Sequence, residues 1–558
     1  MRVTLDKPAA PRAPGSRSTT AACFAAALSA VLLNLAYFPA GQGWLAWFAL
    51  VPWLTLVRAP ISNRTRYLLA FASALGFFLP ALRWMRVAHD AMVYSWLALS
   101  VACAAFAPLA LWLIRRLDRR SWPLTFSVPI VWTALEFVRT HIFGGFPWYL
   151  LGHSQHGVLP LIQIADLVGV PGVTFLVASV NGLLAEAIAG PWSTVRGSSW
   201  RRQAAIVGAL LVSVLGYGFW RLGHAEFRVG PNVALLQTDL EQAIRNSRGD
   251  EPGAQPRSIQ DIRAQTAELT RRAVKSTPPP DLIIWPETTF EYDIKERREP
   301  PGDDPEFAAW FQDLPDREAL VESVATASRA AVLLGVNVQR YHGPGRIDRF
   351  NSSVLVAPSG QMIGRYDKTH LVPFGEYVPL YDVFPFLRNL APYDDSLALL
   401  AAGDQFPRLR LSTNQGEFTF GCMICYEDSY AHLAREYLRG PDRPVDFLVN
   451  QSNDGWFRCT HEHEEHLAVS RFRAVECRRS LVRSANMGIS AIIDGDGRIV
   501  ALPAATWAAS KGVMAVVSGA VPIDDRMSVY VRTGDVLPWL CWLALIVAMV
   551  RQPPDAEP

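Results

Sequence analysis

The chain has 558 residues, of which half are hydrophobic and 19% are charged, and its net charge is +2. Because soluble domains carry roughly 25% charged residues, this composition is not that of an ordinary soluble protein. The near-neutral balance gives no field that would attract nucleic acid, and the length suffices for a membrane bundle plus one soluble domain.

The N-terminal segment, residues 1–20, is rich in Pro, Arg and Ser, and we expect it to be disordered. Hydrophobic runs follow it. A helix needs about 20 apolar residues to cross roughly 30 Å of bilayer hydrocarbon. We therefore predict a domain of about seven transmembrane helices over residues 21–221 and one more helix over 536–550. The predicted spans are 21–38, 43–57, 66–85, 91–114, 123–140, 161–188, 204–220 and 536–550.

Positive charges are unevenly distributed among the segments between these spans. Arg and Lys gather before the first span and after the second, fourth, sixth and last, whereas the opposite loops hold little besides Arg83, Arg86 and Arg139. In membrane proteins the cytoplasmic loops carry the excess of positive charge. Both termini, including the tail 551–558, are therefore predicted to be cytoplasmic, and the long insert 222–533 is predicted to be extracytoplasmic.

The insert alternates two kinds of pattern. Short apolar, β-branched runs such as 282–285 and 418–425 predict strands. Helical patterns occupy about 258–275, 316–330, 429–438 and 463–477. Strands interleaved with helices favour sheets covered by helices. The sequence thus predicts a polytopic α-helical membrane bundle joined to an α/β extracytoplasmic domain.

Two charged residues of the insert follow predicted strands. Glu287 comes after Pro286, which ends a buried-looking strand and leaves the carboxylate free to act as a base. Lys368 closes a predicted pair of strands. For either residue taken alone, an ordinary solvated charge at a strand end is the favoured interpretation.

The loop after Lys368, residues 370–379, sets Glu376 among two prolines, a glycine and apolar side chains. A loop of this composition costs more free energy than a solvated loop and often shapes a site. We expect Glu376 to hold Lys368 or Glu287 in place. The alternative is a simple salt bridge within the loop.

Cys425 ends a strand-like run and is followed at once by Tyr426 and Glu427. An isolated cysteine is most often a buried hydrophobic residue. Together with a base and a cation, however, a thiol has the parts needed for acyl transfer through a thioester. We therefore predict Cys425 as the nucleophile, Glu287 as the base and Lys368 as the cation. Tyr426 and Glu427 are expected to line the pocket or to position its walls.

Cys422 and Cys425 also have the C-x-x-C spacing of a redox pair. Such a motif usually opens a helix, whereas this one ends a strand-like run, so Cys422 is expected to pack behind the strand. The segment His461–His466 has spacing that could bind a metal. Acidic residues at a helix start also suit the helix dipole, which favours a charged N-terminal turn without a metal.

An aromatic segment, residues 143–149, follows the fifth predicted span and contains Trp148. Aromatic residues at that depth are typical of the interfacial belt of membrane proteins. They are also expected to form part of a lipid pocket that faces the insert.

These motifs together resemble those of the carbon–nitrogen hydrolase, or nitrilase, superfamily. Trp285-Pro286-Glu287 is similar to its base element, Tyr366-Asp367-Lys368 to its lysine element and Cys425-Tyr426-Glu427 to its nucleophile element. The resemblance implies a Glu–Lys–Cys triad on a nitrilase-like αββα sandwich, which would make 222–533 a carbon–nitrogen hydrolase domain.

Seven spans before this domain and one after it resemble the apolipoprotein N-acyltransferase family. Segments 146–148, 152–155, 370–379, 450–457 and 532–535 carry the same resemblance. It implies that Trp148 and Trp456, which lie within two of these segments, support substrate binding. The chain departs from the family in lacking a Trp near Asn246.

This resemblance implies a ping-pong acyltransferase that needs no cofactor and no metal. Cys425 would take the sn-1 acyl chain of a membrane phospholipid, with phosphatidylethanolamine as donor. It would then pass the chain to the α-amino group of diacylglyceryl-cysteine in an apolipoprotein, the last step of lipoprotein maturation. The enzyme would lie in the cell inner membrane, with its catalytic domain facing the periplasm.

Two other functions fit parts of the sequence. A membrane-tethered nitrilase-type amidase that acts on a small amide or nitrile would need one anchor, so eight spans are excessive for it. A non-enzymatic transporter or scaffold would be expected to carry broken spans or intramembrane charges. Glu136 and Asp166 are the acids found well inside predicted spans, and the complete set of base, cation and thiol argues against a degenerate domain.

Overall fold

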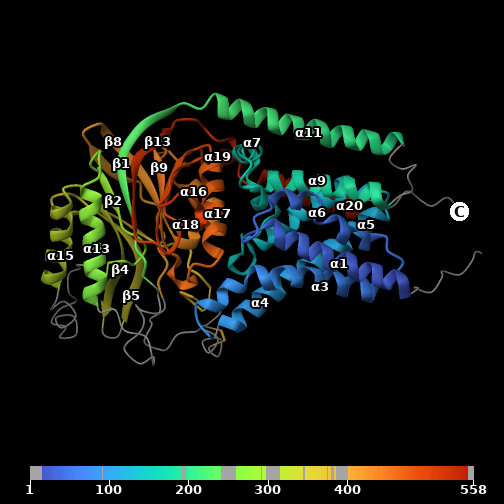
Figure 1. Ribbon diagram of the computed structural model, residues 1–558, viewed down its shortest axis with the longest axis horizontal. Helices are drawn as coiled ribbons and strands as arrows, with labels where there is room; N and C mark the ends of the chain where they lie inside the picture. Colours follow the sequence, from blue (N-terminus) through green and yellow to red (C-terminus); the bar gives the residue numbers. More distant parts are fainter. Residues whose placement is uncertain are drawn as a thin grey trace, which may run out of the picture.

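The protein has two parts, a helical bundle and an α/β domain packed on one end of it, as Figure 1 shows for the computed structural model. The structure describes residues 16–90, 92–189, 197–240, 259–290, 292–296, 314–343, 346–373, 375–378, 383–384, 400–441 and 443–550. Residues 1–15, the tail 551–558 and the surroundings of Asn246 lie outside the described residues.

The bundle is built from hydrophobic helices of both ends of the chain. Its longer helices are α1 (Ser16–Ala36), α3 (Asn63–Ala81), α4 (Met92–Ala104), α5 (Phe106–Asp118), α6 (Leu124–Arg139), α9 (Val170–Ala189), α11 (Ser198–Gly223) and α20 (Val536–Val550). The short helices between them are η1 (Gly43–Trp47), α2 (Val51–Leu54), η2 (Thr55–Val57), η3 (Arg83–Val87), η4 (Ile142–Gly144), η5 (Leu151–Gln155), α7 (Leu159–Ile162) and α8 (Ala165–Val168). The prediction that residues 1–20 are disordered is wrong for residues 16–20, because these residues form the start of α1.

Four helical segments of the described chain are long and apolar enough to cross a membrane. The bundle is therefore the membrane part of the protein. The four segments are Ser18–Ala36, Met92–Asp118, Val170–Ile188 and Ser198–Gly223. Shorter apolar helices cover Gly43–Val57 and Val536–Val550, and α3 and α6 occupy the other two predicted spans. The predicted span 161–188 is broken at Gly169, whose φ of +69° separates α8 from α9.

The α/β domain contains two sheets. The first has the order β13-β1-β2-β4-β5-β6, with β3 paired to β4, and the second has the order β12-β11-β10-β9-β8-β7. The strands of the first sheet are β1 (Phe227–Gln237), β2 (Leu282–Ile284), β3 (Ile294–Lys295), β4 (Ala331–Gly343), β5 (Arg346–Val356), β6 (Met362–Asp367) and β13 (Ala515–Asp524). Those of the second are β7 (Leu409–Thr413), β8 (Gly416–Ile424), β9 (Phe447–Asn453), β10 (Ser480–Asn486), β11 (Ala491–Ile493) and β12 (Ile499–Ala501).

The two sheets stack face to face and helices cover their outer faces. Along β1, Val233 and Leu235 point into the core between the sheets, whereas Ala234 and Leu236 point toward the outer helices. The helices on that side are α13 (Ile259–Val274) and α15 (Leu314–Ser328), and those on the other side are α16 (Ala431–Glu436) and α17 (Glu462–Cys477). The predicted αββα sandwich beside a helical bundle is therefore confirmed. The remaining short helices are η7 (Cys425–Ser429), η8 (Asp454–Phe457), α18 (Trp507–Ser510) and α19 (Val529–Thr533).

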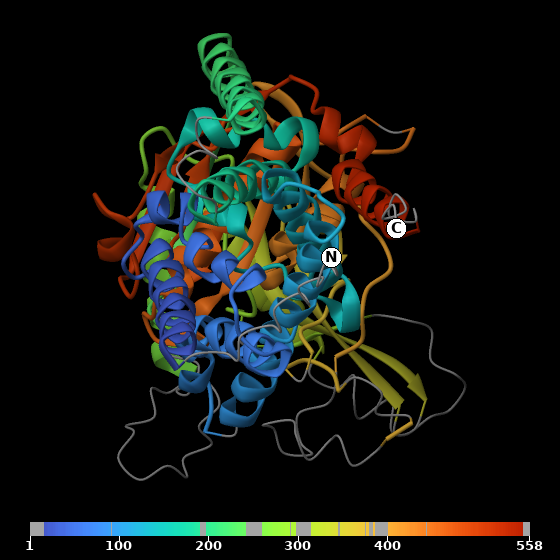
Figure 2. The same ribbon diagram turned by 90° about the vertical axis from the view of Figure 1, so that its right-hand side faces the viewer.

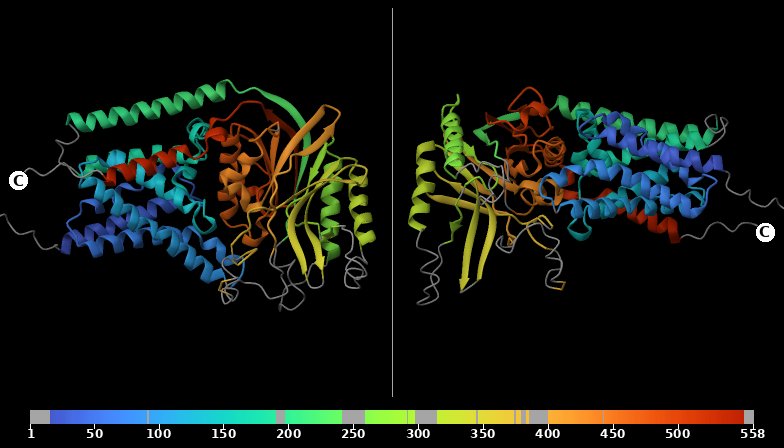
Figure 3. Two further views of the ribbon diagram at one scale, coloured as in Figure 1. Left: turned by 180° about the vertical axis from the view of Figure 1, so that it is seen from behind. Right: turned by 60° about the horizontal axis from the view of Figure 1, so that its bottom comes forward.

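The α16–α17 layer lies between the sheets and the bundle, as both views of Figure 3 show. Asp166, predicted within a span, lies in α8 and joins the two parts, because its carboxylate is 2.7 Å from Arg478 and 2.6 Å from Arg221. Glu136 in α6 accepts hydrogen bonds from Leu151 N and Thr174 Oγ1, each 2.8 Å long. Both acids therefore have a structural role, each with its own hydrogen-bond or ion-pair partners. Seen from the bundle end, α11 lies at the rim of the bundle (Figure 2).

Candidate active site

The residues predicted as base, cation and nucleophile follow strands of both sheets. Strands β2 and β4 run parallel to β1, and β8, β9 and β10 run parallel to one another, so side chains that follow β2 and β8 lie at carboxyl ends. Glu287 comes shortly after β2, Lys368 directly after β6 and Cys425 directly after β8. Sites of α/β proteins form at such strand ends, where side chains from several strands converge.

Glu287 is held by both sheets. Asn351 Nδ2 of β5 donates to Glu287 Oε1 at 2.7 Å, and the backbone N–H of Asn453 at the end of β9 donates to Oε2 at 2.8 Å. The ammonium of Lys368 lies 3.5 Å from Oε1. These donors fix the orientation of a buried carboxylate. Sequence reasoning missed Asn351, because a single Asn inside a strand gave no signal.

Lys368 is almost completely buried, with 1% of its side chain exposed. Its Nζ lies 2.7 Å from Glu376 Oε1, and Glu376 Oε2 accepts a hydrogen bond of 2.8 Å from Val372 N within the same loop. Burial alone would lower the pKa of Lys368, but the carboxylates of Glu376 and Glu287 outweigh burial and raise this pKa above its usual value. The lysine is therefore a permanent cation beside the carboxylate of Glu287.

Cys425 is half-buried and has a left-handed backbone, with a φ of +55°. A non-glycine residue in this region costs about 1–3 kcal/mol and persists where its surroundings over-determine it. Asn450 Nδ2 donates to the carbonyl of Cys425 at 2.9 Å. The conformation turns the chain sharply from β8 into η7 and sets the thiol at the sheet end.

The pKa of the Cys425 thiol depends on the other two predicted catalytic residues, Glu287 and Lys368. Burial raises the pKa of Cys425 well above its usual value, Glu287 adds to the increase, and Lys368 opposes it. The resting sulfur is thus a neutral thiol. Because only the thiolate attacks, this arrangement requires a base that takes the proton during the attack.

Glu427 fastens the loop that carries the cysteine. Its carboxylate accepts hydrogen bonds from the backbone N–H groups of Ile424, Thr369 and His370, 2.7, 2.8 and 2.9 Å long, and from the hydroxyl of Tyr366. It is completely buried. Of the two roles expected for Glu427, the contacts are those of a residue that positions the walls.

The aromatic residues predicted near the site form a contact between the loop and the bundle. Trp148 Nε1 donates to Ser429 Oγ at 2.6 Å, and its ring centroid lies 6.1 Å from that of Tyr426. The ring of Trp84 is tilted against that of Trp148, with centroids 5.3 Å apart, and packs edge-on against Phe457, with centroids 4.7 Å apart. Trp456, the neighbour of Phe457 in η8, is half-buried. These rings make an apolar layer between Cys425 and the membrane helices.

The segment His461–His466 contains the charged N-terminal turn of a helix that we expected. Helix α17 does begin at Glu462, but His463 and His466 are buried against η7 and η8. Tertiary packing covers this helix start, which no local pattern indicates. Ligand atoms of Asp454, Glu462 and His466 lie within 4.8 Å of one another, as in a metal site. Arg483, however, contacts Asp454 and His466 at 2.7 and 2.9 Å.

Cys422 does not form a redox pair with Cys425. All seven cysteines are free, and Cys422 lies in the core between the sheets. Burial raises its pKa above the usual value, and low thiol pKa values are what redox cysteines require. The expected packing of Cys422 is confirmed.

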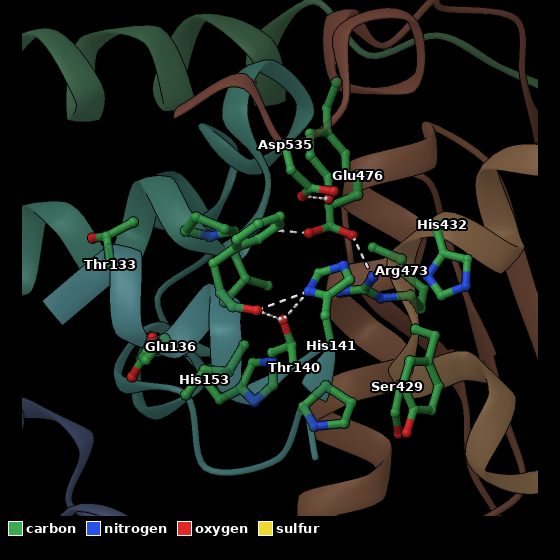
Figure 4. Close-up of a pocket in the computed structure, with 18 residues that line it drawn as sticks. Thr133, Glu136, Thr140, His141, His153, Ser429, His432, Arg473, Glu476 and Asp535 are labelled. Atoms are coloured by element: carbon green, nitrogen blue, oxygen red, sulfur yellow. Dashed lines mark hydrogen bonds and ion pairs between the residues drawn. The ribbon is translucent and has the colours of Figure 1, made fainter. Parts of the chain in front are cut away.

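A separate pocket lies where the bundle meets the domain, and Figure 4 shows its lining. Glu476 of α17 accepts a hydrogen bond of 2.8 Å from Val170 N and lies 2.7 Å from Arg473. His153 of η5 is buried in its wall. Its lining includes Ser429 and Tyr430 but not Cys425, Glu287 or Lys368, so it is distinct from the triad.

Two family models match the chain. The description "Carbon-nitrogen hydrolase" matches residues 234–522 and "Apolipoprotein N-acyltransferase N-terminal domain" matches residues 29–183. The αββα sandwich with its membrane helices therefore defines a membrane-bound enzyme of the carbon–nitrogen hydrolase class.

Proteins of similar sequence identify the family within this class. An apolipoprotein N-acyltransferase of Geobacter metallireducens is 32% identical over 531 residues, covering 92% of each chain. Those of Rhodopirellula baltica and Caulobacter vibrioides are 28% and 30% identical, covering 90% and 85% of this chain and 92% and 83% of theirs. This chain belongs to the apolipoprotein N-acyltransferase family.

Proposed function

We propose that this protein moves the sn-1 acyl chain of a membrane phospholipid to the α-amino group of diacylglyceryl-cysteine at the N-terminus of an apolipoprotein. Phosphatidylethanolamine is the proposed donor. The observation that carries the proposal is the position of Cys425, at the sheet end with Glu287 and Lys368 and next to the bundle through Trp148 and Ser429.

In the first half of the reaction, the sulfur of Cys425 attacks the ester carbonyl while Glu287 takes the thiol proton. The ammonium of Lys368 and nearby backbone N–H groups stabilise the oxyanion that forms. The ester C–O bond then breaks, and Glu287 returns the proton to the leaving alkoxide. A thioester remains on Cys425 and lysophospholipid leaves.

In the second half, the neutral α-amino group of the acceptor attacks the thioester carbonyl. Such an amine has a pKa of about 7.7–8.0, so a fraction of it is neutral near neutral pH. Glu287 takes a proton from the attacking nitrogen, the C–S bond breaks, and the sulfur recovers its proton. The products are the amide and the free thiol of Cys425.

The location of the site suits this substrate. Moving an acyl chain of ~16 carbons into water would cost about 12 kcal/mol at ~0.8 kcal/mol per methylene. The apolar layer of Trp84, Trp148, Tyr426 and Phe457 offers a path along which the chain avoids water. The Arg distribution supports an orientation in the inner membrane with the domain on the periplasmic side.

The alternative of a tethered amidase is not favoured. A small amide requires neither the matched N-terminal domain, residues 29–183, nor an aromatic contact between that domain and the nucleophile loop.

The proposal is tested by mass spectrometry of the full-length protein incubated with phosphatidylethanolamine. We expect one acyl group added at Cys425, none on Cys425→Ala, and an unchanged adduct on Cys422→Ala, the matched control. A diacylated lipopeptide should discharge the adduct, whereas a small amide should not. An adduct that persists in Cys425→Ala would disprove the mechanism, and discharge by small amides alone would support the amidase instead.

A further inference from the structure

A cluster of buried charged residues lies directly behind the nucleophile loop. Its five members come from four elements, and each is at most 1% exposed. They are Asp428 of η7, Asp454 of η8, Glu462 and His466 of α17, and Arg483 of β10. Buried charges are costly unless each has a partner, and removing one partner leaves the others uncompensated. The partners of each charged residue therefore show which part of the chain the cluster holds in place.

Arg483 is connected to the nucleophile by two hydrogen bonds in sequence. Its Nη1 donates to Asn450 Oδ1 at 2.6 Å, and Asn450 Nδ2 donates to the backbone carbonyl of Cys425 at 2.9 Å. Nη2 of the same guanidinium donates to Asp454 Oδ2 at 2.7 Å. The fork of Arg483 thus anchors the carbonyl of a residue whose backbone is in the left-handed region.

The other side of the loop is anchored by Asp428, three residues after Cys425. Its carboxylate is 3.0 Å from His466 Nε2, accepts a hydrogen bond from Ser470 Oγ and lies 3.5 Å from Arg483 Nη1. The imidazole of His466 contacts Arg483 Nη2 through its other nitrogen. The loop is therefore fixed before and after the turn by groups that meet at Arg483.

The same cluster contains the ligand set of a metal site, and Arg483 lies within it. Asp454, Glu462 and His466 have ligand atoms within 4.8 Å of one another. The guanidinium contacts two of these three candidate ligands, the carboxylate of Asp454 and a ring nitrogen of His466. It supplies a positive charge there and, unlike a metal ion, also donates outward to Asn450.

We propose that Arg483 is a positioning residue of this enzyme: an internal cation, in the place of a metal ion, that fixes the backbone of Cys425 through Asn450. This inference rests on the proposed function and deepens it. Arg483 touches neither substrate nor the sulfur. Its effect is to keep the thiol at the carboxyl edge of the sheet, where Glu287 takes its proton.

The test is the rate at which full-length protein forms the acyl adduct with phosphatidylethanolamine. Because a small misplacement of a reacting group costs about 10²-fold, Arg483→Ala and Asn450→Ala should each acylate ~10²-fold more slowly. The half-saturating phospholipid concentration should not change. Guanidinium ion, added below concentrations that unfold the protein, should restore part of the rate of Arg483→Ala and none of that of Asn450→Ala.

Arg479→Gln is the matched control. Arg479 is also buried, but it donates to the carbonyls of Val445 and Asp524 and has no hydrogen-bonded link to Cys425. We expect its acylation rate per folded molecule to equal that of the unmodified protein. Asn450→Ala leaves the ion pairs of Arg483 intact, so it remains informative if Arg483→Ala does not fold.

Three outcomes would overturn the inference. They are an unchanged rate in Asn450→Ala, a loss in Arg483→Ala that appears only as weaker phospholipid binding, and stoichiometric zinc in the unmodified protein that His466→Ala removes. If the unmodified protein forms no adduct at all, the proposed function itself fails, and this result is distinguishable from the other three.

Discussion

The ammonium nitrogen of Lys368 lies 2.7 Å from the carboxylate of Glu376 and 3.5 Å from that of Glu287. The loop acid is therefore the closer ion-pair partner of the lysine. This division of contacts leaves the Glu287 carboxylate bonded mainly to neutral donors, Asn351 Nδ2 and Asn453 N. A carboxylate held in this way keeps a lone pair available for a proton.

Replacing Glu376 by Gln should slow formation of the acyl adduct. Without the charge of Glu376, Lys368 would shift toward Glu287, and misplacement of the cation and base is expected to cost about 10²-fold in rate. The measurement is rapid-quench mass spectrometry of the adduct. Tyr377→Phe, a change at the next residue of the loop, serves as control and should retain its rate. Equal rates for Glu376→Gln and the control would contradict this role.

Replacing Glu427 by Gln should destabilise the protein. The groups around the carboxylate are hydrogen-bond donors, among them Ile424 N, Thr369 N and His370 N. The NH₂ group of a glutamine would therefore face at least one of these donors without an acceptor. A buried donor left unsatisfied costs about 1–3 kcal/mol of unfolding free energy. The midpoint of thermal unfolding in detergent reports this cost. The exposed Glu436→Gln should leave it unchanged, and no difference between the two variants would refute the account.

Glu465 should make stability depend on pH. Burial raises its pKa to about 8, although Phe38 N donates to the carboxylate at 2.9 Å, whereas an unfolded Glu titrates near ~4.3. The neutral acid therefore stabilises the fold, and this stabilisation is lost as the pH rises through about 8. Glu465→Gln should match the unmodified protein at acidic pH and unfold at higher temperature above pH 8. Parallel melting curves across this range would be evidence against the prediction.

Trp148 links the nucleophile loop to the bundle by its ring and by its N–H. Trp148→Phe removes the hydrogen bond to Ser429 Oγ and keeps most of the ring packing, so a rate loss of roughly 10-fold is expected, corresponding to about 1.4 kcal/mol. Trp148→Ala should lose more, because the contacts with Trp84 and Tyr426 also disappear. Acylation with a short-chain and a long-chain donor is the measurement. An unchanged acylation rate in both variants would exclude the link.

Local patterns predicted most of the architecture, because they depend on residues close in sequence. Glu287, Lys368 and Cys425 were found since each follows a strand, and apolar runs mark strands. The partners of Glu287 could not be found in this way. Asn351 and Asn453 lie 64 and 166 residues from it in sequence. Pairing of β2, β4 and β5 within one sheet brings Asn351 close to Glu287, and stacking of the two sheets brings Asn453 close to it.

The same limit explains why the burial of Glu462–His466 was not predicted. Acidic residues at a helix start predict a charged N-terminal turn, but they do not indicate whether other elements bury it. Here η8 and the membrane helices cover the first turn of α17, and a buried arginine of β10 compensates its charge. Burial of this kind follows from long-range packing.

The α/β domain enters and leaves the bundle at one corner. Strand β1 follows α11, strand β13 precedes α19 and α20, and the two strands are antiparallel neighbours that pair Phe227 with Asp524. The two covalent connections between the domain and the bundle therefore lie side by side. Because both junctions lie close together, the domain has the neighbouring ends that allow one domain to be inserted into the chain of another.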